Sequence, residues 1–136
     1  MKDAPKHRIL VVDDAPLIRE TMSFLLAAQG YEVATATDGF EALLQLLVKP
    51  SDLLISDLNM PHLSGFELLS IVRQQFPELP VIAISGAYES SEKVPSGVMA
   101  DAFYPKGGYR LDEIFRTVAD LIHEAPEARN PRQNGT

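Results

Sequence analysis

Short continuous apolar runs alternate along the chain with longer segments in which apolar residues recur every three to four positions. A continuous apolar run indicates a strand that is buried on both faces, and the longer spacing indicates an amphipathic helix. The predicted strands are residues 9–12, 31–36, 53–57, 81–85 and 102–104. This alternation predicts an α/β fold made of βαβ units, with a parallel sheet and right-handed crossovers.

Residues that favour helix ends lie between these runs. Pro16 suits a first helical turn, with Asp14 as a candidate N-cap, and Gly30 suits the end of the same helix. Three further helices are predicted, over 42–48, from Gly65 to the Phe76-Pro77 pair, and over 111–122. By the same alternation a helix belongs between Ser85 and Ala102, but Pro95 and Gly97 lie inside that segment. We therefore expect this fourth helix to be short or distorted.

Length and composition fit one domain. The 136 residues are 46% hydrophobic and 23% charged, which is the balance of an ordinary globular protein. We expect a lead over residues 1–7, a folded domain over 8–124, and a flexible tail or linker over 125–136, where polar residues and two prolines show no periodicity.

Charge and cysteine content exclude several classes of function. The chain has 19 acidic and 12 basic residues and a formal net charge of −7, which argues against nucleic acid as a direct partner. It has no cysteine, so disulfides, thiolate catalysis and cysteine-based zinc sites are excluded. No apolar stretch approaches the roughly 18–20 residues of a membrane helix, and no signal-peptide core follows the charged start. We expect a cytoplasmic protein with no membrane partner.

Polar residues that could carry chemistry follow four of the predicted strands. Asp13 and Asp14 follow the first strand, Asp57 ends the third, Ser85 ends the fourth and Lys106 lies just past the fifth. In an open parallel sheet, ligands bind beyond the carboxyl ends of the strands. Converging carboxylates repel each other unless a cation is present, and oxygen ligands with water-filled positions suit Mg²⁺. With a hydroxyl and an ammonium added, the set suits the handling of a phosphoryl group.

The sequence resembles the receiver domain of two-component response regulators. The resemblance covers roughly residues 8–123, and several motifs together make it specific. The matching residues are Ile9 to Asp14, Thr37 to Leu43, Asp57 to Pro61 with Gly65, Val81 to Ser85, and Lys106.

This resemblance implies a flavodoxin-like (βα)₅ doubly wound sheet with strand order 2-1-3-4-5. It implies that Asp57 accepts a phosphoryl group from a phosphohistidine on a sensor histidine kinase or a histidine phosphotransfer protein. Asp14, Asp57 and the backbone carbonyl of Asn59 would ligate Mg²⁺ directly, and Asp13 would act through water. Lys106 would pair with the phosphoryl group.

The resemblance also implies a conformational switch. Ser85 would move toward the new phosphoryl group, and Phe103, three residues before Lys106, would rotate inward behind it. The changed surface would act on a downstream protein target or an output domain. The domain would not be an enzyme beyond catalysing its own phosphorylation and dephosphorylation.

The chain departs from the family pattern near its fifth strand. Gly107 and Gly108 follow Lys106 where the family has a proline, often after a cis bond, so the position of Lys106 is open. Phe103 lacks the hydroxyl of the commoner tyrosine. Because the irregular fourth helix would disturb the usual dimer surface, we expect a monomer or a weak dimer.

Two other functions remain open at this point. The first alternative is a pseudo-receiver, which would act as a phosphorylation-independent interaction module. The departure at Gly107 favours it, and the complete set of polar residues argues against it. The second is a Mg²⁺-dependent phosphatase or nucleotide-binding enzyme of related architecture. It is disfavoured because Asn59, not an acid, lies two residues after Asp57 and because no phosphate-binding glycine loop is present.

Overall fold

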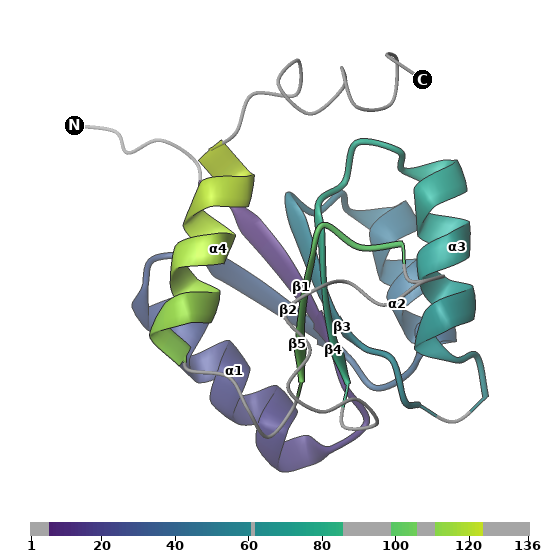
Figure 1. Cartoon of the computed structure of the whole chain (residues 1–136), viewed down its shortest axis with the longest axis horizontal. Coiled ribbons are helices and arrows are strands. Elements are labelled where there is room, and N and C mark those ends of the chain that lie inside the picture. The colour runs from purple at the N-terminus through teal and green to yellow at the C-terminus, as the bar shows by residue number, and fades with distance from the viewer. Residues whose placement is uncertain (1–5, 61, 86–98, 106–110, 124–136) are drawn as a thin grey trace.

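The computed structural model describes residues 6–60, 62–85, 99–105 and 111–123, and Figure 1 shows their arrangement. Its elements in chain order are β1 (Arg8–Val12), α1 (Pro16–Ala28), β2 (Glu32–Ala36), α2 (Gly39–Val48), β3 (Leu53–Asp57), α3 (Gly65–Gln75), β4 (Val81–Ser85), β5 (Ala102–Pro105) and α4 (Leu111–His123).

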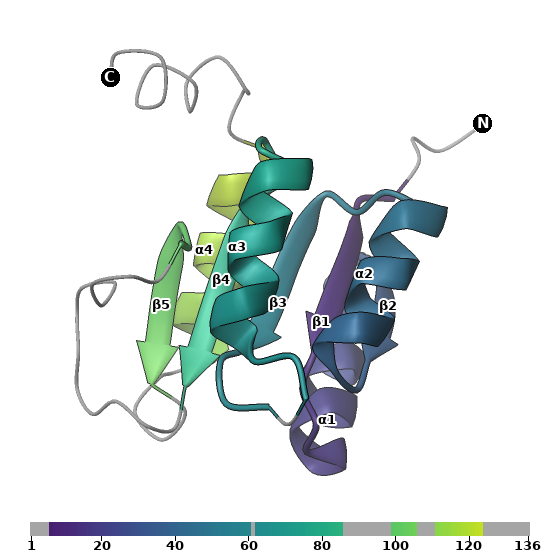
Figure 2. The same ribbon diagram turned by 90° about the vertical axis from the view of Figure 1, so that its right-hand side faces the viewer.

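All five predicted strands form one sheet in the order β2-β1-β3-β4-β5, and every pairing is parallel. The predicted fold class and strand order are thereby confirmed. Figure 2 shows the arrowheads pointing to one edge of the sheet, which we call the carboxyl edge; the opposite one is the amino edge. Side chains that follow the strands therefore gather at a single edge.

Helices cover both faces of the sheet. Helices α1 and α4 lie on one face, and α2 and α3 lie on the other (Figure 1). Successive residues of a strand point to opposite faces, so Ile9 and Val11 pack toward α1 and α4, whereas Leu10 and Val12 pack toward α2 and α3. Both faces are buried, which is why β3 and β4 read as continuous apolar runs.

The structure corrects two expectations about helix starts. Asp14 is not the N-cap of α1: Ala15 holds that position and makes no side-chain capping bond. Helix α2 begins at Gly39, three residues before the predicted start. The carboxylate of Asp38 accepts a hydrogen bond from the Glu41 backbone N–H, and this cap starts the helix despite the low helix propensity of glycine.

Three expectations lie outside the described residues. These are the short or distorted helix between Ser85 and Ala102, residues 1–5 of the lead predicted over 1–7, and the tail over 125–136. Within the described part of the chain, none of the helices has the length and apolar character needed to cross a bilayer.

Candidate functional site

Three carboxylates meet at the carboxyl edge of the sheet. Asp13 and Asp14 follow β1 and Asp57 ends β3, and one carboxylate oxygen from each lies within 4.8 Å of the others. Asp13 is only 2% exposed and Asp57 only 1%, whereas Asp14 is exposed. The sequence predicted this meeting on the condition that the first and third strands are neighbours, and the structure pairs β1 with β3. Two buried like charges and one exposed charge make a site that favours a cation.

The loop after β1 holds Asp13 in place through backbone contacts. The Asp13 N–H donates to the carbonyl of Ala36 on β2, and its carboxylate accepts from the Ala15 N–H at 2.8 Å. The guanidinium of Arg19, one turn into α1, donates to the Asp13 carbonyl at 2.9 Å. These contacts fix both the backbone and the carboxylate of Asp13 before any ligand binds.

The loop after β3 orients Asp57 in a similar way. The backbone N–H of Asn59 donates to Oδ1 of Asp57 at 3.0 Å, and the N–H of Leu58 donates to the carbonyl of Ile84 on β4. The Ser56 hydroxyl, also buried, donates to the Asp57 carbonyl. Contacts with the loop after β3 and with β4 therefore set the orientation of the Asp57 carboxylate.

Gly65 allows α3 to begin directly against this loop. Its N–H donates to the carbonyl of Leu58 at 3.2 Å, and a Cβ at this position would fall well inside van der Waals contact with the Asp57 carbonyl oxygen and the Leu58 Cα. Because both of these are backbone atoms, no side-chain rotation would relieve the clash. A glycine is required here for close packing of α3 on the aspartate loop.

Ser85 is connected to Asp57 through one residue. Its hydroxyl is completely buried and donates to the side-chain carbonyl of Asn59 at 2.5 Å. Asn59 thus bonds to Asp57 through its backbone and to Ser85 through its side chain. The structure joins the acid cluster and the predicted switch hydroxyl in one hydrogen-bonded group.

The remaining predicted residues lie on β5 or past it. Phe103 is buried in the core on the α2 and α3 side, in register with Ala83 of β4, while the Tyr104 hydroxyl bonds to Thr117 on the opposite face. Pro105 ends the strand in register with Ser85. Lys106 and its bond to Gly107 lie outside the described residues.

Sequence reasoning missed three residues that shape this site. It assigned no role to Arg19 or Ser56, and it treated Gly65 as a helix start and a motif residue without expecting its close approach to the aspartate loop. Nothing in the local sequence marks the contacts of Arg19 and Ser56, since both are made to backbone carbonyls. For Gly65, the position just after the β3 loop was a usable sign, because a glycine at a helix start next to a functional loop can indicate close backbone approach.

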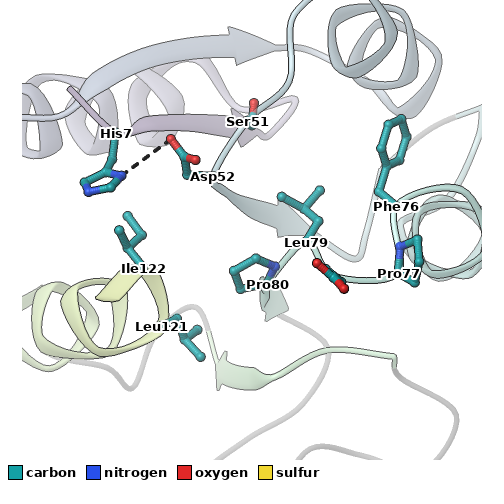
Figure 3. Close-up of a pocket in the computed structure, with 10 residues that line it drawn as sticks. His7, Ser51, Asp52, Phe76, Pro77, Leu79, Pro80, Leu121 and Ile122 are labelled. Carbon is teal, nitrogen blue, oxygen red and sulfur yellow. Dashed lines mark ion pairs between the residues drawn. The ribbon is translucent and has the colours of Figure 1, made fainter. Parts of the chain in front are cut away.

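A pocket of about 470 Å³ lies at the amino edge, away from this site (Figure 3). Its lining includes Leu79, Pro80, Leu121 and Ile122, and at one side His7 forms an ion pair with Asp52 at 3.7 Å. None of the predicted site residues that the structure describes lines it.

The family model described as response regulator receiver domain matches this chain over residues 9–104. The chain belongs to this family. The match includes Asp13, Asp14, Asp57, Asn59, Ser85 and Phe103 of the receiver domain and ends before Lys106.

Curated relatives agree with this assignment. Sensor protein EvgS of Escherichia coli K12 is 39% identical over 128 residues, which cover 92% of this chain and 11% of EvgS. Response regulator MprA of Mycobacterium avium is 34% identical over 116 residues, which cover 85% of this chain and 50% of MprA. The receiver domain thus spans half the length of these relatives or less.

Solved structures agree as well. Response regulator TrrA from Thermotoga maritima, solved in complex with Mg²⁺–BeF, superposes with a TM-score of 0.75 at 36% identity, covering 85% of this chain and 98% of TrrA. Chemotaxis response regulator CheY4 of Vibrio cholerae superposes with a TM-score of 0.77 at 32% identity, covering 86% and 99%. Both neighbours match nearly along their whole length.

Proposed function

We propose that this receiver domain is the phosphoacceptor of a two-component phosphorelay, in which Asp57 takes a phosphoryl group from a phosphohistidine. The observation that carries the proposal is the cluster of Asp13, Asp14 and Asp57, joined through Asn59 to Ser85. A buried carboxylate beside two further acids is costly in a purely structural role. Its position at the carboxyl edge suits a nucleophile for a ligand arriving from solvent.

Asp57 acts as the nucleophile in this proposal. One of its carboxylate oxygens forms a bond to phosphorus while the bond from phosphorus to the donor imidazole nitrogen breaks, and that nitrogen keeps the electron pair. The product is an acyl phosphate. The Asn59 N–H on Oδ1 holds the carboxylate in one orientation, which favours this attack by reducing the motion that must be lost.

The donor set fits Mg²⁺. Three carboxylate oxygens within 4.8 Å of one another are hard ligands with both a buried and an exposed side. Asp14, Asp57 and the backbone carbonyl of Asn59 are the proposed direct ligands, with Asp13 acting through water. When bound, the ion neutralises and orients phosphoryl oxygens. TrrA, with its Mg²⁺–BeF complex, supports this assignment by similarity.

Ser85 and Phe103 form the proposed switch. In the structure Ser85 donates to Asn59, so its hydroxyl must leave that bond to reach a phosphoryl group on Asp57. Phe103 is buried on β5, in register with Ala83 of β4, and would follow this movement. Lys106 is proposed to pair with a phosphoryl oxygen. The resulting change in surface would pass the signal to a downstream protein or an output domain.

The partners follow from the same chemistry. A sensor histidine kinase or a histidine phosphotransfer protein would supply the phosphoryl group, and we propose a cytoplasmic location for this exchange.

Phosphorylation by a small donor tests the proposal. The chain is incubated with Mg²⁺ and acetyl phosphate, and its intact mass is measured. We expect one added phosphoryl group that is labile to base, lost in Asp57→Asn and kept in Asp52→Asn, a matched acid at the amino edge.

Three other outcomes would contradict the proposed function. A chain that takes no phosphoryl group from any donor supports the pseudo-receiver. An adduct that persists in Asp57→Asn contradicts the assignment of Asp57. Sustained phosphate release from an unrelated substrate supports an enzyme.

A further inference from the structure

Helix α2 carries an apolar stripe on the side that faces away from the sheet. Phe40, Leu44, Leu47 and Val48, which we call the α2 stripe, are between 57% and 83% exposed. Buried Ala42 and Leu46 occupy the opposite side of the same helix. A helix that is apolar on both sides is typical of one that is covered on both sides.

The α2 stripe differs from the exposed apolar residues of α1. On α1, Leu17 and Phe24 are also exposed, but Glu20 and Thr21 lie between them on the outer side. On α2 the single charged residue is Glu41, whose carboxylate bonds to Thr37. Single exposed apolar residues are normal on a protein surface, whereas a contiguous group indicates an interface.

We propose that the α2 stripe is a self-association surface, on which a second copy of this chain packs its own α2 in antiparallel orientation. With about 100° per residue, Leu44 lies at the centre of the outer side, Phe40 and Leu47 on one flank, and Glu41 and Val48 on the other. A two-fold axis through Leu44 then brings Leu44 of each copy together. It also places Phe40 of one copy against Leu47 of the other, so that the surface is complementary to itself.

The charges at the ends of α2 favour the same arrangement. Glu41 is in the first turn and Lys49 follows the last residue, so α2 has an acidic start and a basic end. Antiparallel pairing places Glu41 of one copy near Lys49 of the other, on the same flank of the stripe. The Lys49 ammonium has three N–H donors, one of which bonds to Glu32 at 3.2 Å, and its side chain is 58% exposed. The ammonium can therefore donate a further hydrogen bond to a carboxylate of the second copy.

The size of the surface sets the strength of the interaction. One short helix provides less than the roughly 800 Å² per partner of a stable interface. We therefore infer a weak and reversible dimer. The surface lies on the outer side of α2, whose inner side packs on β1, β2 and α3 (Figure 2).

Concentration-dependent association tests the proposal. The full chain is followed by sedimentation from about 1 µM to about 1 mM, the range of weak association. We expect the average mass to rise with concentration, and Leu44→Glu to weaken the association at least about tenfold. Leu17→Glu is the matched control, because Leu17 is 77% exposed on α1, and it should leave association unchanged.

Disulfide trapping identifies the surface in a second way. The chain has no cysteine, so Leu44→Cys creates a single thiol at the proposed two-fold axis, where two Cα atoms can approach as a disulfide requires. We expect Leu44→Cys to form a covalent dimer faster than Phe24→Cys on α1.

Three results would overturn the proposal. A chain that stays monomeric throughout the concentration range would show that the α2 stripe does not bind a second copy. A dimer that survives Leu44→Glu would use another surface. Equal cross-linking rates for the two cysteine variants would show random collision.

Discussion

Two charged side chains are buried at the carboxyl edge of the sheet, whereas an ion pair at the amino edge is half-exposed. At the carboxyl edge, Asp13 and Asp57 are almost completely buried next to each other. At the amino edge, the ion pair between His7 and Asp52 has side chains that are 45% and 50% exposed. Exposed pairs contribute little to stability, and their components are separately well solvated. Buried like charges are retained at a cost, which is typical of a functional site.

The edges also differ in how closely the backbone packs. At the carboxyl edge the start of α3 lies directly against the loop after β3, with room only for Gly65. At the amino edge Gly30 has a positive φ of 104°, but beyond its two chain neighbours no residue comes within 4 Å of the place a Cβ would take. One glycine is needed for space and the other for backbone conformation.

Gly65→Ala should have the largest effect on stability. The new Cβ would collide with two backbone atoms, so α3 and the aspartate loop must separate at a cost of about 3 kcal/mol. Gly30→Ala is the control and should cost about 1–2 kcal/mol, from the left-handed backbone alone. Urea unfolding measures both. Only Gly65→Ala should also slow the uptake of a phosphoryl group, and equal effects of the two variants on uptake would contradict the role given to Gly65.

The parallel sheet could be predicted from the sequence because β3 and β4 are continuous runs buried on both faces. Once the strands were parallel and β1 was next to β3, Asp13, Asp14 and Asp57 had to share one edge. Periodicity predicted the parallel strands, whereas the strand order 2-1-3-4-5 was implied by the resemblance to the receiver family. This explains why the fold and the meeting of the acids were both expected correctly.

Local geometry was harder to predict because it depends on contacts between segments. The predicted start of α2 was wrong by three residues, because the Asp38 cap starts the helix at Gly39, before its first buried apolar side chain. Asp14 looks like a cap in sequence, but its carboxylate lies with the other acids, and Ala15 takes the N-cap position. The contact of Arg19 with the Asp13 carbonyl leaves no trace in the sequence at all.

Magnesium should stabilise the protein through the carboxyl edge alone. A ligand that binds only the folded state adds about 2.7 kcal/mol at 100 times its Kd. We expect Mg²⁺ to raise the melting temperature of the wild-type chain and EDTA to reverse this. The increase should be absent in Asp14→Asn and intact in Asp52→Asn, whose carboxylate lies at the amino edge. Equal increases in all three proteins would mean that Mg²⁺ acts through general screening.

The smallest effect on stability should come from protonation of Glu32, at the amino edge, in acid. Lys49 and Arg8 bond to the Glu32 carboxylate and lower its pKa below the ordinary value of 4.5. A group with a lowered folded-state pKa adds stability above its unfolded pKa and loses that contribution as the pH falls through the folded value. The stability advantage of wild type over Glu32→Gln should therefore be constant from pH 7 to about pH 5 and shrink as the pH falls below 4.5. Urea midpoints of both proteins at each pH measure this difference. Because Glu32 is exposed to solvent, about 1 M salt should also reduce the stability difference between the two proteins at pH 7. A stability difference that grows on acidification would contradict the lowered pKa of Glu32.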